Sequence, residues 1–159
     1  MRPLALERAD VLLVCSSGGH LLQLLELREA WSGLEYLWVT QDRSDARSLL
    51  AEEPVVYAYW PTNRNLKNLV KNAFLAWRVV RRVRPAVVLS TGAGTTVPFA
   101  WIAWAHGARV VYVESLTRIH SPSLSCRLIA PVTDRVYVQW PELKAALPQA
   151  KYAGSVLGR

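Results

Sequence analysis

The stretch Val11-Leu12-Leu13-Val14-Cys15-Ser16-Ser17-Gly18-Gly19-His20 decides the fold class of this chain. Its first half is an uninterrupted apolar run, which is typical of a parallel strand that is buried on both faces. The two serines and two glycines that follow predict a tight turn. Residues 21–31 then carry leucines at the spacing of an amphipathic helix. A strand, a glycine-rich turn and a helix in this order form the opening unit of an α/β fold.

The same alternation continues along the 159 residues. Further strands are predicted at residues 36–40, 55–60, 87–90, 110–114 and 136–139. Helices are predicted at residues 44–52, 66–84, 97–106 and 141–147, and Ser121-Pro122 has the residue types that begin another helix. The predicted fold class is therefore α/β, a Rossmann-like, doubly wound parallel sheet of about six strands. We expect a single domain over residues 1–159, with residues 1–9 disordered or peripheral.

The composition narrows the possible functions. The net charge is +7, 52% of the residues are hydrophobic, and seven Trp stand against two Phe. A basic surface favours an anionic partner, such as a phosphorylated substrate or an acidic lipid, and Trp is enriched at membrane and partner interfaces. Nucleic acid is not expected, because the basic residues concentrate on one helix and no nucleic-acid-binding motif occurs. No apolar stretch reaches the roughly 18 residues of a membrane span and no signal peptide is expected.

The two cysteines, Cys15 and Cys126, have no CxxC spacing and no histidine at metal-ligand distance in the sequence. Buried free thiols in a reducing compartment are therefore expected, and no metal site.

The loops that follow the strands are the candidate binding segments, because ligands of doubly wound sheets lie beyond the carboxyl ends of the strands. Glycine lets a backbone approach a ligand, and a helix start offers free N–H groups to an anion. Two loops fit this description, and we interpret the following as substrate-binding residues: Ser16, Ser17, Gly18, Gly19, Thr91, Gly92, Gly94 and Thr95. The alternative for the first loop is a tight turn that His20 only caps.

Two titratable residues are candidates for catalysis. His20 stands at a helix start, within reach of a phosphate or an acceptor hydroxyl, and Glu114 ends a strand, where a carboxylate can bind a sugar hydroxyl or take its proton. An ion pair with Arg118 and a helix cap remain the alternatives for Glu114. The loop at residues 91–96 also resembles the dinucleotide fingerprint GxGxxG, although Val97 stands where the third glycine is required. A stand-alone dinucleotide-binding domain is therefore the alternative function.

Residues 65–84 predict a basic amphipathic helix. Its basic strip is formed by Lys67, Lys71, Arg78 and Arg82. Its apolar stripe consists of Leu66, Leu69, Val70, Ala73, Phe74, Trp77 and Val80. We interpret the stripe as packed on the core and the basic strip as solvated or facing lipid phosphates; the alternative is a helix that lies on an anionic bilayer.

Five segments occur in an order that resembles a known family: VCSSGGH at 14–20, STGAG at 90–94, YVES at 112–115, VQWPEL at 138–143 and YAG at 152–154. The chain resembles the oligosaccharide-biosynthesis family that contains asparagine-linked glycosylation protein fourteen and the bacterial PssD-type polysaccharide proteins. The resemblance runs from Asp10 to Leu157.

This resemblance implies the amino-terminal half of a GT-B glycosyltransferase that is split into two polypeptides, similar to the amino-terminal domain of MurG. It implies that this subunit binds a polyprenyl-diphosphate-linked acceptor, with residues 16–20 at the diphosphate, on the anionic cytoplasmic face of the membrane. A partner subunit would hold the UDP-sugar, so no cofactor is expected here and no transfer by this chain alone. The implied partner-docking residues are Gln139, Trp140, Leu143, Tyr152 and Gly154.

The eukaryotic members of this family carry an amino-terminal membrane helix, for which we find no counterpart. Peripheral membrane contact is therefore expected, through residues 65–84 or through the segment with Trp101 and Trp104.

Overall fold

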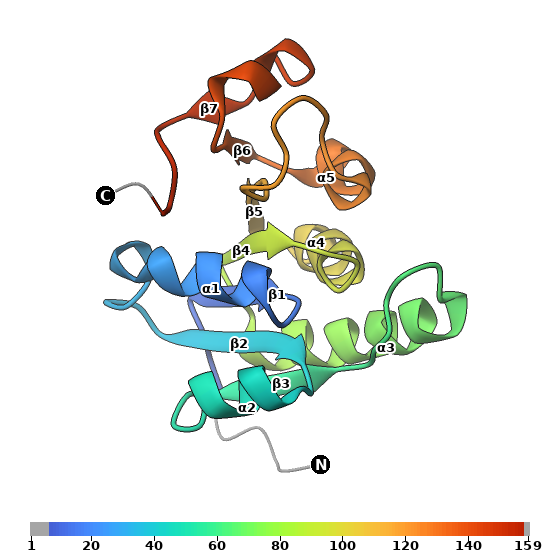
Figure 1. The fold of residues 1–159 in the computed structure, drawn as a ribbon. Coiled ribbons are helices and arrows are strands. Elements are labelled where there is room, and N and C mark those ends of the chain that lie inside the picture. Colours follow the sequence, from blue (N-terminus) through green and yellow to red (C-terminus); the bar gives the residue numbers. More distant parts are fainter. Residues whose placement is uncertain (1–6, 158–159) are drawn as a thin grey trace.

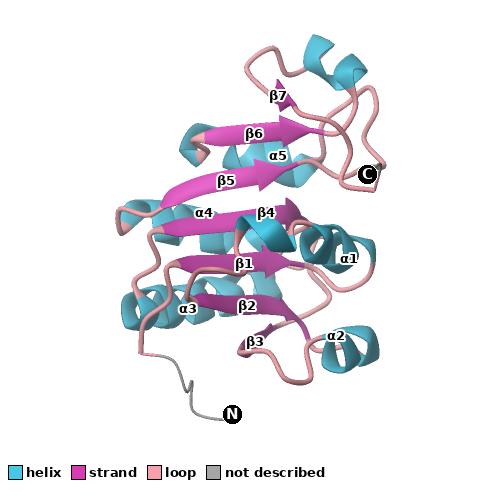
Figure 2. Cartoon of the chain, turned by 90° about the vertical axis from the view of Figure 1, so that its left-hand side faces the viewer, coloured by secondary structure: helices cyan, strands magenta, loops and turns pink. Residues whose placement is uncertain are grey.

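The computed structural model describes residues 7–157, which form one seven-stranded parallel sheet with helices on both faces (Figures 1 and 2). The strands are β1 (Val11–Cys15), β2 (Tyr36–Gln41), β3 (Val55–Ala58), β4 (Val87–Gly92), β5 (Arg109–Val113), β6 (Arg135–Val138) and β7 (Lys151–Tyr152). Their order across the sheet is β3-β2-β1-β4-β5-β6-β7. The order reverses between β1 and β4, and the loops after these two strands flank that switch point.

The helices connect successive strands. They are α1 (Gly19–Glu26), α2 (Ser44–Leu49), α3 (Leu66–Val83), α4 (Thr96–Ala105) and α5 (Leu124–Ile129). Short 3₁₀ turns are η1 (Arg28–Ala30), η2 (Ala130–Val132) and η3 (Pro141–Ala145). Figure 2 shows α1 and α2 on one face of the sheet and α3, α4 and α5 on the other.

Alternating residues of β1 fill the cores on the two faces. Leu12 and Val14 pack with Val79 and Val80 of α3, whereas the neighbouring Leu13 belongs to the cluster under α1 and α2. An apolar run without interruption is what a strand needs when both of its faces are covered. The predicted α/β class and parallel, doubly wound arrangement are confirmed.

Two details differ from the prediction. The helix predicted to begin at Ser121-Pro122 begins at Leu124 instead, because the hydroxyl of Ser123 accepts the backbone N–H of Cys126 at 3.1 Å and caps it. The seventh strand, β7, was not predicted, since it contains two exposed residues and no apolar run.

The expectation for residues 1–9 concerns mainly residues 1–6, which lie outside the described residues, as do residues 158–159. For Ala9 the expectation of a peripheral position is wrong. Its side chain is fully buried and its N–H donates to the carbonyl oxygen of Val83 at 3.0 Å. Among residues 7–157, no helix combines the length and the apolarity that crossing a bilayer requires.

Candidate functional site

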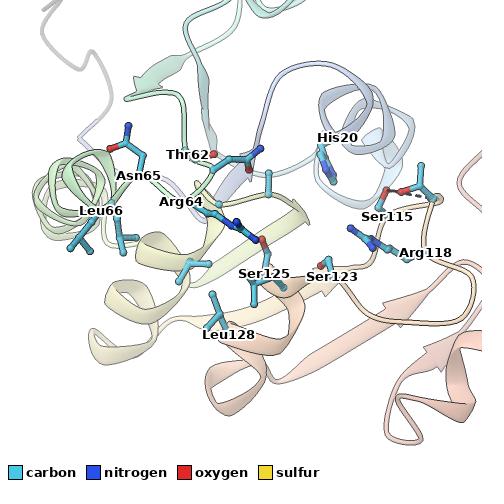
Figure 3. Close-up of a pocket in the computed structure, with 17 residues that line it drawn as sticks. His20, Thr62, Arg64, Asn65, Leu66, Ser115, Arg118, Ser123, Ser125 and Leu128 are labelled. Carbon is cyan, nitrogen blue, oxygen red and sulfur yellow. Dashed lines mark hydrogen bonds between the residues drawn. The ribbon is translucent and has the colours of Figure 1, made fainter.

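A pocket of about 870 Å³ opens at the carboxyl edge of the sheet, where the loops after β1, β3, β4 and β5 converge (Figure 3). Its polar lining residues are His20, Thr62, Asn63, Arg64, Asn65, Ser115, Thr117, Arg118, Ser123 and Ser125. Its remaining lining residues are Leu66, Leu69, Ala93, Gly94, Val97, Leu124 and Leu128. The lining contains two arginines and a histidine but neither aspartate nor glutamate. Such a cationic pocket suits a phosphate or carboxylate ligand.

His20 is fixed in the pocket wall by Thr91, across the switch point. Its Nδ1 atom lies 2.7 Å from the carbonyl oxygen of Thr91, and the Thr91 hydroxyl donates to the carbonyl oxygen of His20 at 2.7 Å. A carbonyl oxygen only accepts hydrogen bonds, so Nδ1 carries a proton. In the neutral ring, Nε2 then keeps its lone pair and can accept a proton.

Gly92 at the end of β4 and Gly94 in the loop after it make room for neighbouring side chains. A Cβ atom on Gly92 would lie 2.7 Å from the hydroxyl oxygen of Tyr112 and 3.1 Å from Cε1 of His20, and its φ is +118°. A Cβ atom on Gly94 would lie 2.9 Å from Cβ of Thr62 in the loop after β3. Glycine at these positions therefore allows the loops to pack closely around the pocket.

The other predicted residues of this loop lie beneath the pocket. Thr91 and Thr95 are fully buried, and the Thr95 hydroxyl has no hydrogen-bond partner among the described residues. From this loop, Ala93 and Gly94 line the pocket. Ala93 has a φ of +78°, a conformation that costs energy in any residue other than glycine.

Of the loop after β1, His20 alone lines the pocket. The N–H of Gly18 donates to the carboxylate of Asp45 at 2.6 Å, and the Ser17 hydroxyl donates to the side-chain oxygen of Gln41 at 3.2 Å. Ser16 is buried, and Gly19 is exposed outside the pocket. The N–H group of Gly18, which was expected to face an anionic ligand, therefore binds an acidic side chain of the protein itself.

Glu114 lies behind the pocket wall rather than in it. It is fully buried, one of its oxygens accepts the N–H of Ser115 at 2.8 Å, and the other accepts the N–H of Ser123 at 2.8 Å. Ser123 caps α5 through its own hydroxyl, and Glu114 accepts the N–H of that cap residue rather than capping the helix itself; no ion pair between Glu114 and Arg118 occurs among residues 7–157. Glu114 thus joins two segments that line the pocket.

The charge of Glu114 also raises the pKa values of two neighbouring groups, Tyr112 and Cys126. Burial raises the pKa of the Tyr112 hydroxyl far above its ordinary value, and the nearby carboxylate raises it further. Burial, followed by the effect of Glu114, raises the pKa of the Cys126 thiol to about 12. Both groups stay neutral at physiological pH.

Sequence reasoning missed Arg64 as a site residue and considered Arg118 only as an ion-pair partner. Arg64 adopts a left-handed φ of +47° in the loop before α3. That loop is held by asparagines of α3: the amide of Asn68 donates to the carbonyl oxygen of Pro61 at 2.9 Å, and Asn72 bonds both backbone groups of Tyr59. The signal that could have found the loop is the pair Asn68 and Asn72, four residues apart, on the otherwise apolar buried face of α3.

The predicted partner-docking residues divide into internal and surface positions. Gln139 and Leu143 are buried, so the prediction that they lie on a docking surface is wrong. Gln139 donates to Gln23 at 2.7 Å and accepts the N–H of Val156 at 3.0 Å. Trp140 is half-buried, and its indole N–H donates to the carbonyl oxygen of Leu116 at 2.6 Å.

Tyr152 and Gly154 remain on the surface, beside a second cavity. This groove of about 600 Å³ lies on the sheet face that carries α1 and α2, where β5 and β6 extend beyond these helices (Figure 2). Its floor includes Leu89, Val111, Val113 and Tyr137, and its walls include Leu27, Trp31, Leu34 and the segment 153–156. The groove is a mainly apolar surface that no helix of the described chain covers.

The apolar stripe of α3 was predicted to pack on the core, and this prediction is wrong for most of it. Leu66 is 73% exposed and Phe74 67% exposed, and Leu69, Val70 and Trp77 are also exposed. The buried face is instead formed by Asn68, Asn72, Leu75, Ala76, Val79, Val80 and Val83. Helix α3 packs against α4, which exposes Trp101 and Trp104, and exposed apolar residues gathered on neighbouring helices mark a binding surface.

The topology and the carboxyl-edge pocket define a Rossmann-like domain of the GT-B class. MurG of Acinetobacter baumannii superposes with a TM-score of 0.72 at 16% identity, over 92% of this chain and 45% of that one. A UDP-N-acetylglucosamine 2-epimerase of Rickettsia bellii gives a TM-score of 0.73 at 13% identity, also over 92% and 45%. The chain therefore spans a little under half the length of these solved structures, and the likeness concerns the fold.

The chain belongs to the family described as oligosaccharide biosynthesis protein Alg14 like, whose family profile matches residues 61–156. It is 26% identical to the UDP-N-acetylglucosamine transferase subunit ALG14 of Homo sapiens, over 95% of this chain and 84% of that protein. The protein of the same description in Eremothecium gossypii is 30% identical over 92% of this chain and 80% of its own length.

Proposed function

We propose that this protein is the acceptor-binding subunit of a two-component, UDP-sugar-dependent glycosyltransferase that acts on a lipid-diphosphate-linked sugar. The observation that carries this proposal is the cationic pocket, which contains no carboxylate and opens beside the exposed stripe of α3. Family membership supports it, since the relatives are named as transferase subunits.

In this proposal the acceptor diphosphate binds between Arg64 and Arg118. Guanidinium groups form paired hydrogen bonds with phosphate oxygens, and the absence of acidic lining residues avoids repulsion of the anion. The hydroxyls of Ser115, Ser123 and Ser125 add donors around the same space. This assigns the diphosphate to the loops after β3 and β5 rather than to residues 16–19.

His20 is the candidate general base. Its Nδ1 proton is held by Thr91, so Nε2 takes the proton from the acceptor hydroxyl as that oxygen attacks the anomeric carbon of the donor sugar. The bond between that carbon and the UDP oxygen breaks, and UDP leaves with the bonding electrons. The donor binds the partner subunit, and this chain needs no cofactor of its own.

The exposed stripe of α3, with Trp101 and Trp104, is the proposed membrane contact at the cytoplasmic face. The stripe is flanked by Lys67 and Arg78, which are exposed, and basic residues beside an apolar helix face favour an anionic bilayer. A polyprenyl-linked acceptor lies in that bilayer, so docking this face brings the pocket to its ligand.

The partner subunit is proposed to dock at the groove beside Tyr152 and Gly154. The sheet face over β5 and β6 carries no helix of the described chain, so an apolar segment of the partner fits there. Burying the groove would remove apolar surface from water, which is the main driving force of stable association.

The test is reconstitution with a UDP-sugar-binding partner, UDP-N-acetylglucosamine and a polyprenyl-diphosphate-linked acceptor. We expect transfer by the complex and none by this chain alone; robust turnover by the single chain would refute the proposal. His20→Ala is expected to lower the rate of the complex by about two orders of magnitude or more, the scale of general-base removal. Unchanged activity of that variant would leave the chain as a recruiting and binding subunit.

The dinucleotide alternative is tested by titrating the protein with NAD and NADH. We expect no binding, because both oxygens of Glu114, the residue placed to bind a ribose, already accept backbone N–H groups. Saturable binding of either nucleotide would favour the alternative.

A further inference from the structure

Two buried glutamines, here called the glutamine pair, lie between the pocket and the groove. Gln23 of α1 and Gln139, which follows β6, are 6% and 3% exposed, and the side-chain nitrogen of Gln139 donates to the side-chain oxygen of Gln23 at 2.7 Å. Burying an amide group costs free energy unless its donors and its acceptor find partners. Neither glutamine lines the pocket, so neither touches a ligand that is bound there.

Backbone groups at the two ends of the glutamine pair fix the orientation of both amides. The oxygen of Gln139 accepts the N–H of Val156 at 3.0 Å, so its nitrogen faces inward and donates to Gln23. The oxygen of Gln23 also accepts the N–H of Leu116 at 2.9 Å, which leaves its nitrogen to donate to the carbonyl oxygen of Gly19 at 3.0 Å. Neither amide can turn over without placing two donors or two acceptors against each other.

One end of the glutamine pair holds the wall of the groove. Among residues 7–157, the segment 154–157 is joined to the rest of the chain by two hydrogen bonds, from the hydroxyl of Ser155 at 3.4 Å and from the N–H of Val156 at 3.0 Å. Both bonds end on the side-chain oxygen of Gln139. A bound segment that fixes or displaces this wall therefore acts directly on Gln139.

The other end holds the backbone of two loops that line the pocket. Leu116, which donates to Gln23, lies two residues before Arg118, and Gly19, which accepts from Gln23, directly precedes His20. Arg118 and His20 both line the pocket. A single side chain thus bonds the loop that carries the arginine and the turn that carries the candidate base.

We propose that the glutamine pair couples the groove to the pocket, so that a segment bound in the groove fixes the turn of His20 and the loop of Arg118. When the wall moves away, the oxygen of Gln139 loses its donors and the amide is free to turn, which weakens its bond to Gln23. Because Gln23 bonds both loops, the two loosen together. The nature of the occupant, a segment of the partner subunit, rests on the proposed function. The inference adds that the partner prepares the pocket of this subunit as well as supplying the donor.

The experiment measures amide hydrogen exchange in the purified full chain by NMR while the groove wall is changed at one position. Val156→Pro removes the N–H that reaches Gln139, whereas the matched control Val156→Ala keeps this N–H and shortens the side chain. We expect the Leu116 amide to exchange about fivefold faster in Val156→Pro, the scale of one hydrogen bond, and at the wild-type rate in Val156→Ala. The Tyr59 amide, which donates to the side chain of Asn72 at 2.8 Å, is the internal reference and should not change.

Three outcomes of the exchange measurement overturn the coupling. The first is an unchanged rate at Leu116 in Val156→Pro. The second is equal acceleration in both variants, because the wall would then act through the packing of Val156 rather than through its hydrogen bond. The third is an equal acceleration at Tyr59, which would report a general loss of stability.

A second measurement tests whether the effect passes through the glutamine pair. Gln139→Leu keeps the approximate volume of the side chain and removes its hydrogen bonds. In the wild-type background Val156→Pro should shift the NMR signals of the His20 imidazole, and in the Gln139→Leu background it should not. The same shift in both backgrounds overturns the route. The exchange measurement does not depend on the folding of Gln139→Leu.

Titration with inorganic pyrophosphate separates this inference from the proposed function. Coupling between two sites is reciprocal, so saturating pyrophosphate should slow exchange of the Val156 amide by about fivefold, although Val156 does not line the pocket. Binding of pyrophosphate without an effect at Val156 overturns the coupling and leaves the proposed function intact. If the wild-type chain binds no pyrophosphate, the proposed pocket ligand fails, and the exchange rate of Leu116 in Val156→Pro still decides the coupling.

Discussion

His20 and Thr91 hold each other through two hydrogen bonds of 2.7 Å, one from the imidazole Nδ1 to the Thr91 carbonyl oxygen and one from the Thr91 hydroxyl to the His20 carbonyl oxygen. His20 lies just after β1, at the start of α1, and Thr91 lies in β4; the two strands are neighbours in the sheet although 71 positions separate the residues in sequence. The switch in strand order therefore sets both the orientation and the tautomer of the candidate base.

Thr91→Val should impair catalysis more than folding. Valine keeps the shape of the side chain but removes the hydroxyl that holds the backbone of His20, at a cost of about 1 kcal/mol in the free energy of unfolding. Thr133→Val is the matched control, since the Thr133 hydroxyl also donates to a backbone carbonyl at 2.7 Å but lies away from the pocket. We expect similar losses of thermal stability in both variants, and a lower kcat of the reconstituted complex in Thr91→Val alone. Equal kcat values would contradict a positioning role.

Gly92→Ala should destabilise the protein by about 2–4 kcal/mol, because the new methyl group meets the Tyr112 hydroxyl and the residue has a positive φ. Gly33→Ala is the control, since a Cβ atom there meets nothing within 4 Å and its φ is not in the left-handed region. Chemical unfolding measures both. A loss below about 1 kcal/mol for Gly92→Ala would show that Tyr112 and His20 move aside at little cost.

Glu114→Gln should lower the free energy of unfolding by about 1–3 kcal/mol, because its amide NH₂ must face one of the two backbone N–H groups that the carboxylate accepts. The control is Glu142→Gln, which changes an exposed glutamate. Glu114→Gln should also lower the affinity for pyrophosphate, since the carboxylate holds Ser115 and Ser123, which line the pocket. Wild-type stability would show that Glu114 does not hold these segments together.

The two cysteines should resist alkylation in the folded protein. Burial raises the pKa of Cys15 from 9.0 to about 12, and that of Cys126 to about 12, so the reactive thiolate is scarce at pH 8. The unfolded chain releases these protons near pH 9 and the folded chain only near pH 12. The stability from neutral thiols is thus complete below pH 9 and is lost as the pH rises toward 12. Mass spectrometry after iodoacetamide treatment should show labelling only in denaturant; full labelling of the native protein would contradict the burial.

Phe74→Ser/Trp77→Ser should weaken binding to vesicles that contain phosphatidylglycerol by at least about tenfold, since both side chains are exposed and would enter the bilayer. Co-sedimentation measures the bound fraction, and Leu49→Ser on the opposite face should bind as wild type. If the control weakens as much as the double variant, the contact is not specific to α3.

The fold could be predicted because its signals are long and local. The run at Val11–Cys15 and the glycine turn after it required a buried parallel strand, and α3 was predicted to within a residue or two. Which face of α3 is buried could not be predicted, because its exposed stripe is apolar too and the buried face contains Asn68 and Asn72. These asparagines bond the loop before the helix, a tertiary contact that no periodicity reports.

The site was predicted less completely for the same reason. His20 was identified because it follows a strand and two glycines, a local signal. Arg64 lies in an irregular loop, and its place in the pocket depends on packing against the loop of Gly94. The interior position of Gln139 depends on Gln23, which is 116 residues away in sequence.

The side chain of Gln139 links the pocket and the groove, because it bonds segments beside both. Its amide nitrogen bonds Gln23, which also accepts the N–H of Leu116 in the loop of Arg118, while its amide oxygen bonds Ser155 and Val156 at the edge of the groove. An enzyme divided between two polypeptides gains freedom for each half to diverge. Under the proposed function, one glutamine limits that freedom, because a change that alters the groove for a new partner also disturbs the loop beside the pocket. The choice of partner and the choice of acceptor would then be inherited together.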